Sequence, residues 1–243
     1  MKYRLKKYRL IIISVILLAA GAISVLYINK NSAYWVEPVK NETIEEIREA
    51  KAKKLMIVAH PDDETLWGGI HLLEDDYYVV CITNGNNDVR SREFSKIIKA
   101  TGNQGIILSY PDKVNGRRDD WSRVYGKITD DMERIINAKN WELIVTHNPD
   151  GEYGHMHHVM TDRIVTGLCE EAGRTDKLFY FGRYYKKADL EKIKDGKEPY
   201  GEGQVLQKEN VLKLYKSQKE TVDKLSHMNP YEDWISYKEW KNY

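Results

Sequence analysis

Residues 54–69 read KLMIVAHPDDETLWGG, an apolar run that changes abruptly into a cluster of one histidine and three acids. The apolar part is typical of a buried strand, and Pro61 cannot donate to a sheet ladder, so we expect the strand to end at His60. Helix capping explains one or two acids here, because carboxylates satisfy the free N–H groups of a first helical turn. Capping gives no reason for His60, and a metal site is therefore the competing interpretation.

The chain that follows alternates between short apolar runs and segments with helical periodicity. Three more strand-like runs are YYVVCIT at 77–83, GIILSY at 105–110 and WELIVTH at 141–147. Helix-like segments cover residues 63–76, 91–102 and 122–139. Gly102 suits the position just after a helix end. The alternation predicts an α/β fold with a Rossmann-like, mostly parallel sheet and helices on both faces.

Polar loops follow the carboxyl end of each strand-like run, and ligands of open α/β sheets bind at that edge. The loops are HPDDE at 60–64, TNGNNDVR at 83–90, YPDK at 110–113 and HNPDGEYGHMHH at 147–158. The first loop has three acids where a dinucleotide site needs a glycine-rich turn, and the acids would repel phosphate. We therefore expect no nucleotide cofactor.

The first thirty residues differ from the rest of the chain. Residues 1–10, MKYRLKKYRL, carry five basic residues and no acid, and Leu10–Ile28 has no charge. At about 1.5 Å per helical residue, this stretch nearly spans a hydrocarbon layer of about 30 Å. We expect residues 1–30 to hold an N-terminal transmembrane helix that leaves the remaining chain outside the cytoplasm. A signal peptide cleaved near Ala20-Gly21-Ala22 is the alternative, and it would secrete the domain.

After this segment we expect a polar linker at 31–53 and one domain at 54–243. Residues 1–30 hold six Lys/Arg and no acid, so the remainder carries 38 − 6 = 32 basic and 37 acidic residues, a net charge of −5. A mildly acidic body without a basic stripe argues against nucleic acid as a partner. Cys81 and Cys169 lie in apolar runs and are interpreted as buried hydrophobic residues.

A second cluster, GHMHHVMTDRIVTGL at 154–168, opens a predicted helix. His155 and His158 are three residues apart and therefore share a helix face. Two neutral histidines and one carboxylate can hold Zn²⁺ and leave its fourth position for water. The isolated His71 and His227 lack such partners, and we interpret them as structural.

AHPDDE at 59–64, together with YGHMHH at 153–158, resembles the PIG-L/LmbE family of zinc-dependent deacetylases. These enzymes remove the acetyl group from N-acetylglucosamine units. The resemblance extends from about Lys54 to Gln218. It implies a zinc cofactor and an N-acetylated amino-sugar substrate.

The resemblance implies a role for each matching residue of the two clusters. His60, Asp63 and His158 would be the zinc ligands. Asp62 would be the general base that accepts a proton from the attacking water, and such groups typically contribute about 10²–10⁴-fold. His155 would stabilise the oxyanion or protonate the leaving amine.

Three further residues match less specific positions of the family. Tyr153 would approach the carbonyl oxygen, and Arg90 and Asp112 would hold the sugar. An Arg90–Glu93 helix pair and a turn aspartate are the structural alternatives for the last two. The family often has an acid where this chain has His157, and an imidazole cannot favour a charged His155 as a carboxylate would.

We therefore expect a membrane-anchored, extracytoplasmic zinc amidohydrolase that acts on an N-acetylglucosamine-containing envelope glycan or glycoconjugate. Two alternatives stay open. The same metal triad could hold Fe²⁺ for oxygen chemistry, or the protein could bind envelope carbohydrate without catalysis. The aromatic tail, HMNPYEDWISYKEWKNY at 227–243, is expected to pack against the body.

Overall fold

The computed structural model describes residues 13, 15–18, 20–21, 32–190 and 198–242. The chain divides into two compact units, Met1–Glu37 and Pro38–Tyr243. The first unit contains the short 3₁₀ helix η1 (Ser32–Tyr34). All the elements below belong to the second unit.

A six-stranded sheet forms the centre of this unit, in the order β3-β2-β1-β6-β7-β8. Its strands are β1 (Lys54–Val58), β2 (Tyr77–Thr83), β3 (Gln104–Tyr110), β6 (Leu143–Thr146), β7 (Leu178–Phe181) and β8 (Trp234–Ser236). All neighbouring pairs are parallel except β7 and β8. The predicted mostly parallel sheet is therefore confirmed, and each of the four expected strands is present. A separate antiparallel hairpin joins β4 (Lys113–Val114) to β5 (Arg117–Arg118).

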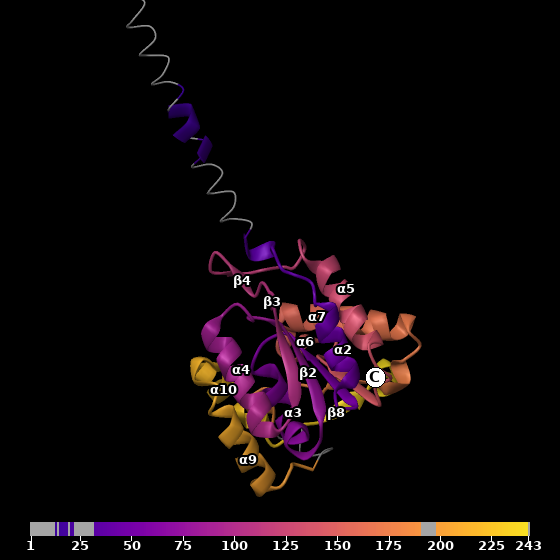
Figure 1. Ribbon diagram of the computed structural model, residues 1–243. Coiled ribbons are helices and arrows are strands. Elements are labelled where there is room, and N and C mark those ends of the chain that lie inside the picture. The colour runs from indigo at the N-terminus through magenta and orange to yellow at the C-terminus, as the bar shows by residue number, and fades with distance from the viewer. Residues whose placement is uncertain (1–12, 14, 19, 22–31, 191–197, 243) are drawn as a thin grey trace, which may run out of the picture. The chain divides into compact units, whose positions relative to one another are not determined.

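Helices cover both faces of the sheet, as expected for this fold (Figure 1). The four crossover helices are α3 (Asp63–Glu74), α4 (Asp88–Thr101), α5 (Tyr125–Asn137) and α7 (Met156–Glu171). The other helices are α2 (Asn41–Glu49), α6 (Gly151–Gly154), α9 (Glu202–Leu212), α10 (Lys219–Leu225) and α11 (Tyr237–Lys241). Short 3₁₀ turns are η2 (Thr175–Lys177), η3 (Lys187–Asp189), η4 (Lys216–Gln218) and η5 (Ser226–Met228). The helices α4, α9 and α10 lie on one side of the sheet, and α2, α5 and α7 lie on the other.

The central strands are apolar because both of their faces are covered. All seven residues of β2 are buried, as are Leu55 to Val58 of β1. The helix α4 begins where the side chain of Asn87 accepts hydrogen bonds from the N–H groups of Val89 and Arg90. It ends at Gly102, whose φ of 73° is left-handed, which confirms the predicted helix end.

The order of the strands reverses between β1 and β6. The chain builds β1, β2 and β3 outward in one direction and then returns through α5 to place β6 on the other side of β1. The loops after β1 and β6 consequently diverge to opposite faces and leave a crevice at the carboxyl edge of the sheet. Both histidine clusters follow these two strands.

Part of the expected linker at 31–53 is folded. The helix α2 packs its buried Ile44 and Ile47 toward the body. The N–H of Val39 donates to Asp131 Oδ1 over 2.9 Å, which ties the segment before α2 to α5. The compact unit therefore begins at Pro38 rather than at Lys54, because an isoleucine pair at helical spacing gives residues 41–49 an apolar face.

The predicted membrane anchor, Leu10–Ile28, lies largely outside the described residues. Within the part of the chain that the structure describes, no helix combines the length and apolar character needed to span a membrane. Cys81 and Cys169 are free and buried, which confirms their interpretation as hydrophobic residues.

The aromatic tail packs on the body, as expected, and adds strand β8 to the sheet. The Trp234 indole stacks on the ring of His71, with centroids 3.6 Å apart. The same segment carries Glu232, whose carboxylate accepts hydrogen bonds from the N–H groups of Ile70 and His71. These contacts fix the end of the chain against α3.

A buried ion pair gives a stability prediction. The side chains of Lys208 and Glu232 are both inaccessible to solvent, and Lys208 Nζ lies 2.8 Å from Glu232 Oε2. We expect Glu232→Ala to lower the free energy of unfolding by about 3–5 kcal/mol, because it leaves a buried ammonium unpaired. Urea unfolding would measure this. Glu142→Ala, which breaks the exposed pair with Lys53, is the control and should cost less than about 1 kcal/mol.

The same pair makes stability depend on pH. Burial opposes the charge of Glu232, but Lys208 lowers the pKa of this carboxyl from 4.5 to about 2. A lowered native pKa contributes stability that is complete above the unfolded value and is lost as the pH falls through the native value. Wild type should therefore lose this contribution between about pH 5 and pH 2. If the free energy of unfolding fell equally with decreasing pH in wild type and in Glu232→Ala, the assignment would be contradicted.

Candidate active site

The loop after β1 delivers the first cluster to the crevice. Asp62 precedes α3 with a φ of 127°, which is unusual for a residue with a side chain. Two interactions hold it there. Its N–H donates to Glu64 Oε2 over 3.1 Å, and its carboxylate pairs with Arg90.

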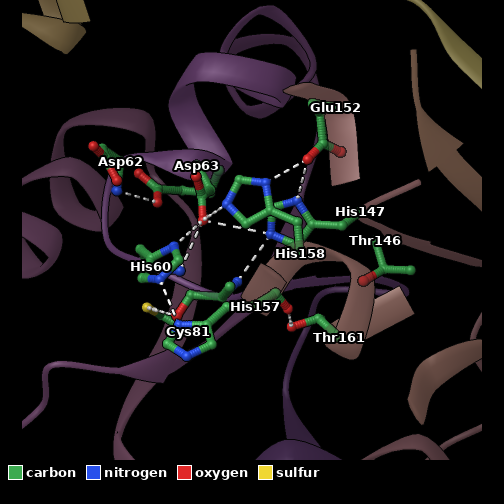
Figure 2. Close-up of polar contacts among 12 residues, drawn as sticks. His60, Asp62, Asp63, Cys81, Thr146, His147, Glu152, His157, His158 and Thr161 are labelled. Carbon is green, nitrogen blue, oxygen red and sulfur yellow. Dashed lines mark hydrogen bonds and ion pairs between the residues drawn. The ribbon is translucent and has the colours of Figure 1, made fainter. Parts of the chain in front are cut away.

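Asp63 lies at the centre of the site (Figure 2). Its Oδ2 accepts a hydrogen bond from the backbone N–H of His60 over 2.8 Å and lies 3.1 Å from His60 Nδ1. The same oxygen is 3.3 Å from His158 Nε2 and 3.4 Å from His147 Nε2. The structure thus brings together the three residues expected to bind metal, His60, Asp63 and His158.

His158 presents a free ligand atom to Asp63. Its Nδ1–H donates to the carboxylate of Glu152, which places the lone pair on Nε2. That buried Nε2 makes no hydrogen bond to any residue that the structure describes.

His60 is oriented from its other side by His157. The Nε2–H of His157 donates to the carbonyl of Asp119 over 2.7 Å, so its Nδ1 carries the lone pair. That Nδ1 lies 3.0 Å from His60 Nε2 and accepts its hydrogen. On the other side of the ring, His60 Nδ1 faces Asp63 Oδ2. The His157 ring is stacked on Trp121 at a centroid distance of 4.2 Å.

Asp63 Oδ2 thus lies within 3.3 Å of both His60 Nδ1 and His158 Nε2, and a cation bound among these three atoms would contact all of them. Three other groups of described residues have ligand atoms within 4.8 Å of one another: Asp63 with His147 and His158, His60 with His155 and His158, and His60 with Asp112 and His157. His147 is a poor ligand because its Nε2 already accepts the N–H of Ala59 over 3.0 Å. The donor set of two imidazoles and one carboxylate suits Zn²⁺.

Glu152 and His147 adjoin the proposed ligands, and neither was given a role from the sequence. Glu152 Oε2 accepts hydrogen bonds from Nδ1 of both His147, over 3.1 Å, and His158. The backbone φ of Glu152 is 55°. Its side-chain Oε1 accepts a hydrogen bond from the N–H of Asn148 over 3.1 Å. A glutamate six residues before a proposed ligand histidine was the available signal, since such ligands commonly donate their other N–H to a carboxylate.

Asp62 lies next to the proposed metal position. Its carboxylate is not directed at the histidines that surround Asp63. Burial, followed by the charge of Asp63, raises the pKa of Asp62 well above its usual range, and Arg90 opposes this. Arg90 Nη2 lies 3.2 Å from Asp62 Oδ1. The alternative Arg90–Glu93 pair is wrong, because Glu93 instead accepts hydrogen bonds from the N–H and hydroxyl of Ser217.

His155 lies beside the proposed metal position, and its Nδ1 forms no hydrogen bond with a described residue. Its ring centroid is 4.3 Å from that of His158 and 4.7 Å from that of His60. Burial, followed by these two imidazoles, lowers the pKa of His155 to about 2. Among the described residues, His157 hydrogen-bonds to His60 and not to His155. The presence of His157 in place of the family's acid therefore affects the orientation of the proposed ligand His60.

The remaining predicted residues border the same crevice. Asp112 Oδ1 is 2.9 Å from Arg118 Nη1 and 3.5 Å from His60 Nε2, so Asp112 is more than a turn residue. Arg118 on the β4–β5 hairpin was not identified from the sequence. Tyr153 is 43% exposed, and its ring lies 5.7 Å from that of His158.

The His157 contact predicts a change in metal affinity. His157→Leu removes the acceptor for His60 Nε2–H and should weaken Zn²⁺ binding by about 10–100-fold, the usual effect of losing a partner of a metal ligand. His157→Asn keeps an oxygen near the Nδ1 position and should largely preserve the affinity. Competition with a chromophoric chelator measures both, and thermal unfolding checks the fold. Equal losses in the two variants would assign the effect to packing on Trp121.

Comparisons with known proteins agree with this geometry. The sequence model of the family described as GlcNAc-PI de-N-acetylase (PIG-L) matches residues 55–169. An uncharacterised protein of Acanthamoeba polyphaga mimivirus is 32% identical over 132 residues, covering 47% of this chain and 57% of its own length. The 1D-myo-inositol 2-acetamido-2-deoxy-alpha-D-glucopyranoside deacetylase of Rhodococcus opacus is 23% identical over 161 residues, covering 51% and 55%.

The N-acetylglucosaminyl-phosphatidylinositol de-N-acetylase of Bos taurus is 26% identical over 135 residues, covering 49% of this chain and 51% of its own length. The chain thus spans about half the length of the curated relatives it matches. The crystal structure of an antimicrobial-pseudoaglycone deacetylase superposes with a TM-score of 0.54 at 16% identity, covering 72% of this chain and 85% of that one. This likeness concerns the fold.

Proposed function

The chain belongs to the PIG-L family, whose sequence model matches residues 55–169, and from this premise we propose that it is a metal-dependent N-deacetylase. Its substrate is an N-acetylglucosamine-containing molecule, and its products are acetate and a free amine. The names of the relatives from Rhodococcus opacus and Bos taurus support this reaction class.

One observation carries the proposal. The buried Nε2 of His158 has no hydrogen-bond partner among the described residues and points to Asp63 Oδ2, 3.3 Å away. A buried nitrogen with its lone pair toward a carboxylate is costly unless a cation lies between them. His60, Asp63 and His158 are therefore the proposed ligands, and Zn²⁺ is the proposed ion.

Amide hydrolysis requires an activated water, a stabilised oxyanion and a proton for the leaving nitrogen. Zinc supplies the Lewis acidity that makes water a nucleophile near neutral pH and polarises the carbonyl. Asp62 accepts the proton of the attacking water, since its carboxylate is beside the ligands and unligated. The pKa of Asp62, raised by burial, suits a group that must take up a proton and release it again.

The other residues position the substrate and the developing charges. His155, neutral and with Nδ1 free of hydrogen bonds to described residues, faces the reacting centre and can stabilise the oxyanion through a ring N–H; it delivers a proton to the amine only after taking one up. Tyr153 stands beside it at a ring distance of 6.0 Å. Arg90 holds Asp62 in place, and Arg90 and Asp112 remain the proposed contacts of the sugar.

We also propose that the domain acts outside the cytoplasm, held by an N-terminal anchor. The uncharged stretch Leu10–Ile28 and the five basic residues before it support this placement. An exported enzyme meets cell-envelope glycans, which makes an envelope glycan or glycoconjugate the proposed substrate. Protease added to intact cells should digest the domain and reach the N-terminus only after lysis, and protection of the domain until lysis would contradict this topology.

Acetate release by the purified full-length chain tests the reaction. The substrates are N-acetylglucosamine, its β-linked disaccharide, a glycolipid analogue and an unrelated acetyl amide. We expect release from the sugars only, its loss after chelation and its recovery with Zn²⁺. Iron dependence with oxygen consumption would favour the oxygenase alternative, and sugar binding without release from any substrate would favour a non-catalytic carbohydrate-binding protein.

A further inference from the structure

A cavity of about 730 Å³ opens beside the metal centre. Its lining comes mainly from the segment after β7 and from α10, and includes Tyr153, Tyr184, Tyr185, Lys186, Thr221 and Lys224. Ligand sites of small molecules occupy about 300–1,000 Å³, so the cavity is large enough for a sugar ring. An acetamido group alone would not fill it.

Tyr153 connects the cavity to the reacting centre. Its ring lies 5.7 Å from that of His158 on one side and 5.8 Å from that of Tyr184 on the other. Tyr184 is in turn supported by His227, whose ring is 5.7 Å away and whose Nε2 is 2.9 Å from the carbonyl oxygen of Tyr185. A substrate held at the metal can therefore extend past Tyr153 into the cavity.

Nearly all of this lining lies outside the part of the chain that matches the family. The match ends at residue 169, and every lining residue except Tyr153 follows it. The residues that shape the cavity therefore lie almost entirely outside the segment that the family model matches.

The chemistry of the lining selects a class of ligand. Three tyrosines offer flat apolar faces with hydroxyl groups at the edge, which suits a ring that carries hydroxyls. Lys186 and Lys224 are exposed and form no ion pair with any residue that the structure describes, whereas Asp189 is the one acid of the lining. Two ammonium groups against one carboxylate favour an anion, although the body as a whole is acidic.

We propose that this cavity is a subsite for a second sugar ring bearing an anionic group, joined to the acetylated amino sugar. The proposal rests on the deacetylation proposed above. The second ring lies against Tyr184 and Tyr185, and its anion pairs with Lys186 and Lys224. The enzyme then prefers an acidic disaccharide to a neutral one and to the monosaccharide.

The test compares three substrates: N-acetylglucosamine, its neutral β-linked disaccharide, and glucuronic acid joined to N-acetylglucosamine. We expect kcat/KM for the acidic disaccharide to exceed that for the neutral one by about tenfold, the effect of a charge-assisted contact. Lys186→Gln and Lys224→Gln should remove most of this preference and leave the monosaccharide rate unchanged. Lys96→Gln, an exposed lysine of α4, is the matched control.

Calorimetric binding of the same acidic disaccharide, carrying a free amine instead of the acetamide, separates this proposal from the reaction. Binding that Lys224→Gln weakens supports the subsite even if no substrate is deacetylated. Equal kcat/KM for the acidic and neutral disaccharides would overturn the proposal. So would binding and turnover of the acidic disaccharide that neither lysine variant changes.

Discussion

Asp62→Asn is expected to reduce turnover by about 10²–10⁴-fold and to leave the bound metal in place. The reason is that Asp62 accepts the proton of the attacking water without being a ligand, whereas the ligand atoms belong to His60, Asp63 and His158. Asparagine preserves the shape of the side chain but cannot accept a proton. Steady-state acetate release and metal content of the same preparation are the two measurements.

The control is Asp120→Asn, an exposed acid before α5, which should leave both quantities at wild-type values. Arg90 loses its charged partner in Asp62→Asn, so Arg90→Gln is needed to show how much of the loss comes from that pair. Retained turnover in Asp62→Asn would refute the general-base role. Loss of metal together with turnover would make Asp62 a ligand.

His158→Ala is expected to abolish activity by removing the metal, with Zn²⁺ affinity lowered by more than the roughly 100-fold typical of losing a ligand's hydrogen-bond partner. His158 is the one proposed ligand from the second cluster, and its free Nε2 completes the set with His60 and Asp63. Inductively coupled plasma mass spectrometry and chelator competition measure content and affinity.

Glu152→Gln provides a graded comparison for the same site. It removes the negative charge that both imidazole N–H groups meet at Oε2, and its single amide oxygen cannot replace both Oε2 and the Oε1 that accepts the Asn148 N–H, so the affinity should fall by about 10–100-fold, less than in His158→Ala. The control is His227→Ala, which alters a residue outside both ligand clusters. It should change neither the metal content nor the Zn²⁺ affinity. Full affinity in His158→Ala would show that a different cluster, such as Asp63 with His147 and another donor, holds the ion.

Local patterns account for the parts of the fold that the sequence anticipated. Apolar runs in β1 and β2 are long enough to be strands and too uniformly apolar to have a solvent face, which implies a sheet covered on both sides. The glycine at 102 ends α4 because its left-handed φ suits a residue without a side chain. The folded helix α2 was missed because its two isoleucines give a weak signal within a polar segment.

Candidate ligands were also visible in the sequence, because AHPDDE and GHMHH place donors at strand and helix ends. The hydrogen bonds of these ligands could not be predicted from the sequence. The carbonyl of Asp119 accepts a hydrogen bond from His157, and His157 contacts His60, across 38 and 97 positions of the chain. Nothing in the local pattern around His157 predicts that its ring turns away from His155.

By itself, the sequence determined the parallel α/β architecture and the two clusters of donors, because hydrophobic periodicity and donor spacing are local properties. Only the tertiary structure decided which groups the ring nitrogens of the histidines contact, that Arg90 pairs with Asp62, and that a tyrosine- and lysine-lined cavity adjoins the centre. These features depend on which distant segments the folded chain brings within hydrogen-bonding distance. Proton positions and cavities are properties of those contacts.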